Sequence, residues 1–329
     1  MKSPGRQLSR WVDHLLDRSI LFSFDKSGFA RHSGEFREED LEVDLTGRVC
    51  LVTGANSGLG RVVATELARR QATVWMLCRH PGRGRTACRE ISLESGNSQV
   101  HLATVDISDQ GSVSEFVSSF PSPRVDVLVH NAGVLLAERG ESVDGIESTL
   151  ATHVTGPFLL TRLLVERLER SDDARVVWVS SGGMYGARLN VGDLQWLQRQ
   201  FDGVRAYAEA KRAQVILSEL FASRWIGRNI SAYAMHPGWA DTPGVRRSLP
   251  RFWQRLEDRL RTPAEGADTI LWLSVCKRLL GRTGLFWFDR QAVPTHLVPW
   301  TRGSDKERRC LWKLCEELTH TEEREEKVA

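Results

Sequence analysis

The sequence lacks the patterns that mark the commonest metal, disulfide and hydrolase sites. None of the nine histidines has the spacing of metal ligands, and no serine lies in a Gly-x-Ser-x-Gly elbow. The six cysteines are widely spaced, without a Cys-x-x-Cys pair, and two of them lie in apolar runs. This usage favours reduced thiols in an intracellular protein over a disulfide framework. We therefore expect no metal, no disulfide-stabilised secreted domain and no α/β hydrolase.

Long apolar runs and a large excess of one charge are also absent. The formal net charge is +3, with basic and acidic residues interspersed, which argues against a nucleic-acid partner. No stretch approaches the ~20 apolar residues of a membrane-spanning helix. Residues 11–24 come nearest, but Asp13, Asp17 and Arg18 interrupt them. We expect a cytoplasmic protein in which this segment is a helix packed on the core or, as an open alternative, a helix on a membrane surface.

Short apolar runs alternate with longer helical patterns over most of the chain. Such alternation is typical of parallel strands joined by right-handed crossovers, with helices on both faces of the sheet. The predicted strands are 48–53, 73–78, 100–105, 125–130, 175–180, 230–235 and 284–288, and the predicted helices include 58–70, 84–94, 145–170 and 204–225. We predict an α/β fold with a Rossmann-type doubly wound parallel sheet of about seven strands. This single domain spans 47–300, with an N-terminal extension at 1–46 and a C-terminal helix and charged tail at 301–329.

The first predicted strand runs directly into a glycine-rich turn that opens a helix. Gly54 permits a tight turn, Gly58 lets the backbone approach a pyrophosphate, and Gly60 allows the helix to pack closely on the sheet. The helix N-terminus adds free N–H groups and the positive end of a dipole. This context predicts a dinucleotide site formed by Gly54, Asn56, Ser57, Gly58, Leu59 and Gly60.

The end of the second predicted strand indicates which dinucleotide binds. Enzymes that use NAD carry an acidic residue there to bind the ribose 2′-hydroxyl. Here the strand ends in Cys78-Arg79, followed by further basic residues and no carboxylate. The Arg79 guanidinium can hold a 2′-phosphate through charge-assisted hydrogen bonds. We expect NADP(H) in preference to NAD(H), with a solvated basic loop as the alternative interpretation.

A tyrosine and a lysine have the spacing of a catalytic pair. Of the three tyrosines, only Tyr207 is followed by a lysine four residues later, at Lys211. On a helix these two side chains project from the same face. The nearby cation is expected to lower the pKa of the phenol, which is about 10 when unperturbed. Tyr207 is therefore our candidate general acid or base.

The turn spacing Gly-x-x-x-Gly-x-Gly resembles that of the short-chain dehydrogenase/reductase superfamily, and the other motifs of this family follow in order to about residue 300. The resemblance implies that Ser181 orients the substrate oxygen, that Ser180 is structural, and that Lys211 hydrogen-bonds the nicotinamide ribose. It also implies further cofactor-site residues, namely Asp106 and Ile107 at the adenine, the structural Asn131, Ala132 and Gly133, and Pro237, Gly238 and Thr242 after the sixth strand.

One position departs from the family pattern. Many members carry an asparagine, in an Asn-x-x-Gly context, that supports a water-mediated proton relay to the lysine. Here the matching residue is His153. Its imidazole could take over the relay, because imidazole binds water and exchanges protons near neutral pH. The alternative, a relaxed position in a weakened enzyme, stays open.

Two segments flank the substrate side of the site in this family. One is the insert 182–206, and the other is the aromatic, basic stretch 239–261. Their apolar content suggests a small lipophilic carbonyl or alcohol as substrate. Several strings, including His236-Pro237-Gly238-Trp239, resemble one subgroup of the family whose substrates are poorly defined.

We therefore predict hydride transfer between NADP(H) and such a substrate. Two other functions stay open, namely a cofactor-binding regulatory or scaffold protein with little turnover, and a membrane-surface retinol or steroid dehydrogenase. The sequence also leaves open a homodimer and peripheral contact with a membrane.

Overall fold

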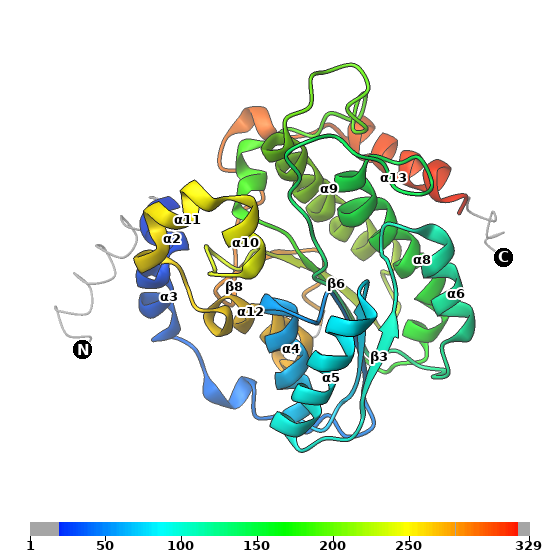
Figure 1. Cartoon of the computed structure of the whole chain (residues 1–329), viewed down its shortest axis with the longest axis vertical. Coiled ribbons are helices and arrows are strands. Elements are labelled where there is room, and N and C mark those ends of the chain that lie inside the picture. The colour runs from blue at the N-terminus through cyan, green and yellow to red at the C-terminus, as the bar shows by residue number, and fades with distance from the viewer. Residues whose placement is uncertain (1–19, 280, 322–329) are drawn as a thin grey trace.

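The computed structural model describes residues 20–279 and 281–321 (Figure 1), so most of the helix predicted at 11–24 lies outside the described residues. Eight strands form one sheet in the order β3-β2-β1-β4-β5-β6-β7-β8. Strands β1 to β7 pair in parallel and β8 is antiparallel to β7. The strands are β1 Val49–Thr53, β2 Thr73–Cys78, β3 Val100–Thr104, β4 Val127–His130, β5 Ala174–Val179, β6 Ile230–Met235, β7 Phe286–Phe288 and β8 Gln291–Ala292. The predicted doubly wound α/β fold is confirmed.

Helices cover both faces of the sheet (Figure 1). One core lies between the sheet and the helices α4 Gly58–Arg69, α5 Pro81–Ser95 and α12 Pro263–Val275. The other lies beneath α6 Gln110–Ser119, α8 Gly156–Glu169 and α9 Gly203–Arg224, and α13 Asp305–Thr319 packs against α8 and α9. Short 3-10 turns occur at Glu38–Asp40, Gly182–Gly186, Glu257–Arg259, Lys277–Leu279 and Pro299–Thr301.

The edge strand β8 was missed by the sequence prediction. It is joined to β7 by the two-residue turn Asp289-Arg290, and both turn residues have positive φ angles, of 46° and 59°. Positive φ at both positions is the geometry of a tight hairpin, usually made by Asn-Gly or Asp-Gly. The second residue here is arginine, and two strand residues are too few for a periodic pattern. The strand was therefore not recognisable.

The helix predicted at 145–170 is interrupted. It consists of α7 Ser148–Leu150, a π-helical turn at Ala151–Thr155 and α8. The Glu147 carboxylate caps its beginning by accepting hydrogen bonds from the backbone N–H groups of Thr149 and Leu150, at 2.8 and 2.7 Å. Single π-helical turns inside helices are frequent at functional sites, and His153 lies on this one.

The N-terminal segment forms two short helices, α2 Ile20–Phe24 and α3 Lys26–Ser33. Figure 1 shows them beside α11 Pro250–Leu256, which follows α10 Pro243–Ser248. The Asp25 carboxylate caps the N-terminus of α3 by accepting hydrogen bonds from the backbone N–H groups of Ser27 and Gly28. Phe24 is buried in the core that lies beneath α6, α8 and α9. The described part of the extension is therefore integrated with the rest of the fold.

Candidate active site

The glycine-rich turn connects β1 to α4. Gly54 and Gly58 have φ angles of +66° and +55°, which glycine adopts without steric cost. A Cβ atom on Gly54 would lie 2.9 Å from the Cα atom of Ala132. Ser57 precedes α4, but its side chain does not cap the helix. The first N–H groups of α4 are thus left for an anionic ligand.

An asparagine ties the carboxyl end of β4 to that of β1. Asn131 donates from Nδ2 to the carbonyl oxygen of Thr53 at 2.9 Å, and the backbone N–H groups of Asn131 and Ala132 donate to the Thr53 hydroxyl, both at 2.9 Å. A Cβ atom on Gly60 would lie 2.3 Å from this amide nitrogen. Gly60 therefore makes room for Asn131, whose contacts agree with the structural role that the family resemblance implies. Sequence reasoning missed Thr53.

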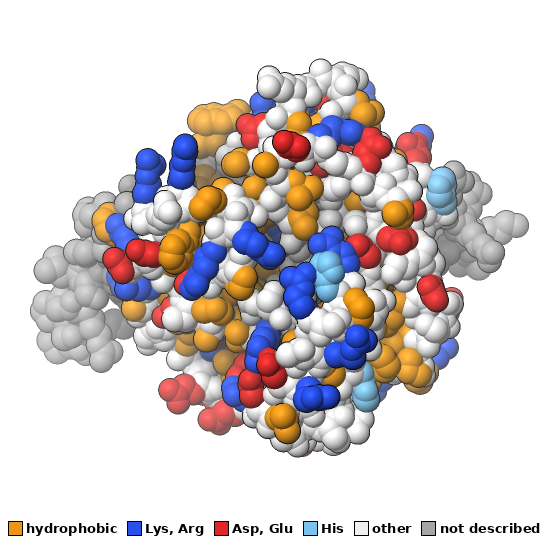
Figure 2. Space-filling model, viewed as in Figure 1, with side chains coloured by type: hydrophobic (Ala, Val, Ile, Leu, Met, Phe, Trp, Pro, Cys, Tyr) orange, Lys and Arg blue, Asp and Glu red, His pale blue; other side chains and the backbone are white. Residues whose placement is uncertain are grey.

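The residues expected at the adenosine end lie after β2 and β3. The Arg79 guanidinium is about half exposed, and its Nε lies 3.8 Å from the Asp106 carboxylate. That carboxylate also accepts hydrogen bonds from the backbone N–H and hydroxyl of Ser108, while Ile107 is buried. Desolvation and the cations Arg83 and Arg79 lower the pKa of His80. The end of β2 is therefore positively charged, and Figure 2 shows basic side chains gathered over the beginnings of α4 and α5.

One predicted residue, Thr242, approaches the glycine turn from a neighbouring segment, whereas Asn56 lies in the turn and Leu59 in the first turn of α4. Thr242 caps α10 by accepting a hydrogen bond from the N–H of Val245, and its Cβ would lie 3.5 Å from a Cβ on Gly58. Leu59 packs at the edge of the core beneath α4. Asn56 is partly exposed in the turn. The structure thus brings these residues together around one loop.

The Ser181, Tyr207 and Lys211 side chains meet at the carboxyl end of β5. The Lys211 ammonium donates to the carbonyl oxygen of Val179 at 2.7 Å and lies 5.4 Å from the centre of the Tyr207 ring. The Ser180 hydroxyl donates to the carbonyl oxygen of Lys211 at 2.8 Å, which joins β5 to α9. Ser181 begins the following turn, and its hydroxyl also favours the ionised form of Tyr207. This arrangement can hold an oxygen atom and pass a proton to it.

The expected direction of the Tyr207 pKa shift is wrong for this structure. Burial raises the pKa of Tyr207, and the Ser181 hydroxyl offsets this only in part. Burial also lowers the pKa of Lys211 to about 7. A lysine with that pKa is largely neutral above pH 7, so it supplies less positive charge to the phenol than the sequence argument assumed.

His153 is fully buried, and its ring contacts the backbone of Val134. Its Nε2 lies 2.8 Å from the carbonyl oxygen and 3.0 Å from the amide nitrogen of Val134. The ring packs edge-to-face on Tyr207 at 5.3 Å, and a Cβ on Gly133 would overlap it at 2.6 Å. Burial and the Lys211 cation lower the pKa of His153 well below its usual value. The imidazole therefore stays neutral near pH 7. The proton relay and the relaxed position both stay open for His153.

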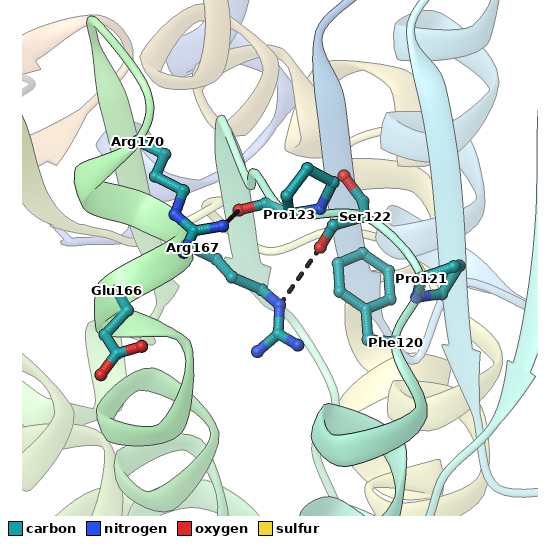
Figure 3. Close-up of a pocket in the computed structure, with 7 residues that line it drawn as sticks. All are labelled: Phe120, Pro121, Ser122, Pro123, Glu166, Arg167 and Arg170. Atoms are coloured by element: carbon teal, nitrogen blue, oxygen red, sulfur yellow. Dashed lines mark hydrogen bonds between the residues drawn. The ribbon is translucent and has the colours of Figure 1, made fainter.

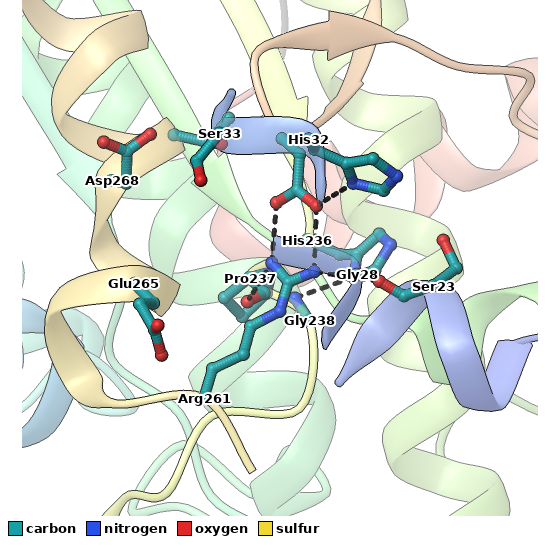
Figure 4. A network of polar contacts seen from close by, with 12 residues as sticks. Ser23, Gly28, His32, Ser33, His236, Pro237, Gly238, Arg261, Glu265 and Asp268 are labelled. Atoms are coloured by element: carbon teal, nitrogen blue, oxygen red, sulfur yellow. Dashed lines mark hydrogen bonds and ion pairs between the residues drawn. The ribbon is translucent and has the colours of Figure 1, made fainter. Parts of the chain in front are cut away.

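A buried ion pair supports the loop that carries Pro237 and Gly238. Arg261 is fully buried and donates to both carboxylate oxygens of Asp289, at 2.6 and 2.8 Å (Figure 4). A Cβ on Gly238, which has a φ of +72°, would lie 2.4 Å from the guanidinium. Sequence reasoning missed this pair because its partners are 28 residues apart and no local pattern marks them.

The same ion pair anchors the N-terminal segment. Arg261 also donates to the carbonyl oxygens of Ser23 and Asp25, at 2.9 and 3.1 Å, and His32 contacts Asp289 at 2.6 Å. Figure 4 shows Ser23 beside the Arg261 guanidinium and His32 beside the carboxylate with which the guanidinium pairs. The N-terminal segment and the loop after β6 are therefore held by one charged centre.

Phe24 lies between the loop that follows β5 and the loop that follows β6. Its carbonyl oxygen accepts a hydrogen bond from the N–H of Trp239 at 2.8 Å, and its ring is 4.3 Å from that of His236. A Cβ on Gly182, directly after Ser181, would lie 2.5 Å from the Phe24 ring. The position of Phe24 could not be predicted, because it contacts residues more than 150 positions away.

The insert 182–206 uses most of its apolar side chains for packing. The side chains buried in the core are Met184, Tyr185, Leu189, Leu194 and Trp196, whereas Leu197 is 69% exposed. The apolar content of the insert is thus explained by the core, and it no longer indicates a lipophilic substrate. Trp239, which is partly exposed and packs edge-to-face on Phe252 at 5.4 Å, is apolar surface beside the site.

A surface pocket lies at the opposite edge of the sheet (Figure 3). It is formed by the loop before β4 and the C-terminal part of α8. Arg167 and Arg170 donate to the carbonyl oxygens of Ser122 and Pro123. Because the carboxyl ends of the strands carry the functional residues in such folds, we assign this pocket no part in the site.

Within the described residues there is no group of three or more metal-ligating side chains and no helix long and apolar enough to cross a membrane.

The phosphate-type turn after β1 and the Ser181–Tyr207–Lys211 group after β5 together define a nucleotide-dependent α/β oxidoreductase. A family model described as short chain dehydrogenase matches residues 48–251. The chain therefore belongs to the short-chain dehydrogenase/reductase family, and it is an oxidoreductase of the kind that acts on CH–OH groups.

Known relatives place the chain within this family. Dehydrogenase/reductase SDR family member 12 of Homo sapiens is 42% identical over 304 residues, which are 92% of this chain and 95% of the relative. This is the subgroup that the strings around His236 resemble, so that prediction is confirmed. Retinol dehydrogenase 12 of Bos taurus is 36% identical over 281 residues, 84% of this chain and 88% of the relative. A short chain dehydrogenase from Escherichia coli complexed with NADPH has a TM-score of 0.61 and 25% identity, covering 78% of this chain and 100% of that one.

Proposed function

We propose that the chain binds NADP(H) and interconverts a carbonyl compound and its alcohol, with Tyr207 as the proton donor or acceptor. The observation that carries the proposal is the convergence of Ser181, Tyr207 and Lys211 at the sheet edge that also holds the glycine turn. The bound nicotinamide supplies or accepts the hydride. Ser181 then orients the substrate oxygen, and Tyr207 passes its proton to that oxygen in reduction or takes it back in oxidation.

The charge at the end of β2 supports NADP(H) over NAD(H). Arg79 is half exposed and only loosely paired with Asp106, at 3.8 Å. Its guanidinium can therefore turn towards a 2′-phosphate and form charge-assisted hydrogen bonds. The related Escherichia coli protein has NADPH bound, which agrees with this proposal.

Fluorescence titration with NADPH and NADH tests the cofactor preference. We expect NADPH to bind at least about tenfold more tightly, and Arg79→Asp to remove that difference. Arg89→Asp is the matched control, because Arg89 is an exposed arginine further along α5. Equal affinity of the unmodified chain for both cofactors would contradict the proposal.

A lipophilic substrate is the class that we favour. The related retinol dehydrogenase is named for an apolar alcohol, and Trp239 with Phe252 gives apolar surface next to the loop after β6. A screen of aliphatic, aromatic and retinoid aldehydes and ketones, followed by NADPH absorbance, tests this choice. Turnover of polar carbonyl compounds alone would contradict the substrate class.

The same screen separates an enzyme from a regulatory cofactor-binding protein. The enzyme consumes NADPH with at least one compound, whereas the regulatory alternative binds NADPH without any turnover. The homodimer, the cytoplasmic location and the peripheral membrane contact stay predictions, which sedimentation and vesicle binding of the full chain can test.

A further inference from the structure

Gln214 lies three residues after Lys211 on α9 and is completely buried. Its side-chain oxygen accepts a hydrogen bond from the Lys211 ammonium at 3.1 Å. Its side-chain nitrogen donates to the backbone carbonyl oxygen of His153 at 2.9 Å. One amide therefore connects the catalytic lysine directly to the π-helical turn.

The chemistry of the two partners fixes the orientation of this amide. An ammonium group can only donate hydrogen bonds, and a carbonyl oxygen can only accept them. Only one of the two amide orientations satisfies both Lys211 and His153. The opposite orientation would leave two buried polar groups unpaired, which costs free energy in an apolar interior.

The contacts of Lys211 leave room for a ligand. An ammonium has three N–H donors, and within the described residues it donates one to the carbonyl oxygen of Val179 and one to Gln214. One donor is left for the cofactor or for Tyr207. Two fixed bonds also set the direction of the side chain, which would otherwise rotate freely around its four-carbon stem.

We propose that Gln214 is a positioning residue that holds Lys211 for the reaction and fills the space between Lys211 and the His153 carbonyl. This inference rests on the proposed function, because it concerns the lysine of that site. An amide does not ionise near neutral pH, so no proton leaves Lys211 by this route.

The orientation of the Gln214 amide predicts how substitutions of Gln214 change the pKa of Lys211. The neighbouring titratable groups, Tyr207 on α9 and His153 on the π-helical turn, are both uncharged near pH 7, because burial raises the pKa of the first and lowers that of the second. Gln214→Leu removes the oxygen that accepts a hydrogen bond from the Lys211 ammonium, so it should lower the pKa of Lys211. Gln214→Glu places a carboxylate beside the ammonium, so it should raise this pKa.

The pKa of Lys211 can be measured without cofactor or substrate, by trace acetylation with acetic anhydride across about pH 4 to 10 and mass spectrometry of the peptide that contains it. We expect the pKa to fall by about one pH unit in Gln214→Leu and to rise by at least about one in Gln214→Glu. Gln214→Glu has the same shape as the native residue, so it keeps the test decisive if Gln214→Leu does not fold. Ser218→Ala is the control, because this buried hydroxyl on the next turn of α9 makes no hydrogen bond within the described residues.

Activity provides the second measurement. The pH profile of kcat/KM should move in the same directions as the pKa of Lys211, with a fall in kcat of at least about tenfold in Gln214→Leu and no change in Ser218→Ala. Shifted acetylation profiles without turnover by any variant would refute the proposed function and leave the lysine contact established. An unchanged Lys211 pKa in both Gln214 variants would overturn the inference, whatever the activity.

Discussion

The ion pair between Arg261 and Asp289 allows a quantitative test of how the N-terminal segment is attached. Asp289→Asn preserves the shape of the side chain and removes its charge. The Arg261 guanidinium would then stay fully buried without its anion, and His32 would lose its carboxylate partner. The other acceptors of Arg261 are neutral backbone carbonyl oxygens of Ser23, Asp25 and Pro237.

Removing one partner of a buried ion pair costs about 3–5 kcal/mol of unfolding free energy, because the remaining charge is left uncompensated. We expect the low end of this range for Asp289→Asn, since three carbonyl oxygens still accept hydrogen bonds from Arg261. Arg261→Met should cost a similar amount. The double variant should be less destabilised than the sum of the two by roughly 1.5–3 kcal/mol, because neither charge is then left alone.

Urea unfolding followed by tryptophan fluorescence measures these free energies, and the 11 tryptophans give a strong signal. Glu169→Gln is the control, since its ion pair with Arg228 is partly exposed and should change stability by less than about 1 kcal/mol. An Asp289→Asn variant as stable as the control, or two single variants whose effects simply add, would refute the role given to this pair.

Three further predictions follow from the geometry of the site. Gly60→Ala places a Cβ 2.3 Å from the Asn131 amide and 2.6 Å from the Gly54 carbonyl oxygen, so it should destabilise the fold by about 1–3 kcal/mol and weaken NADPH binding in a titration; unchanged affinity would contradict the packing described. His153→Asn should keep or raise activity, because the imidazole is neutral near pH 7, and a large loss in steady-state assays would show that the ring has a role of its own. The pKa of Lys211 is about 7 in the folded chain and ~10.4 when unfolded, so between these values the unfolded chain binds more protons. The unfolding free energy should then rise with pH over this interval, relative to Lys211→Met, by about 4–5 kcal/mol; parallel pH profiles of the two proteins would contradict the burial of this lysine.

The central sheet was predictable because its strands are buried on both faces. The apolar runs that begin near Arg48, Thr73 and Ile230 carry no competing helical pattern and end at polar or glycine residues. The glycine turn was predictable for a similar reason, since its residues are adjacent in sequence and their backbone angles follow from local sterics. The tyrosine–lysine pair needed only the periodicity of a helix.

The surroundings of these residues depend on contacts between distant segments. Phe24 reaches Gly182, and Arg261 reaches Ser23 across 238 residues, and neither contact leaves a mark in the local pattern. The pKa shift of Tyr207 was misjudged because burial decides its direction, and spacing gives no measure of burial.

Loss of the Tyr207 hydroxyl tests the central claim most directly. Tyr207→Phe keeps the ring that packs on His153, so NADPH affinity measured by fluorescence should stay within about threefold of the native value. With the best substrate from the screen, kcat/KM for NADPH-dependent reduction should fall by at least about 100-fold, because the proton donor is gone. A Tyr207→Phe variant that binds NADPH and retains full activity would contradict the account.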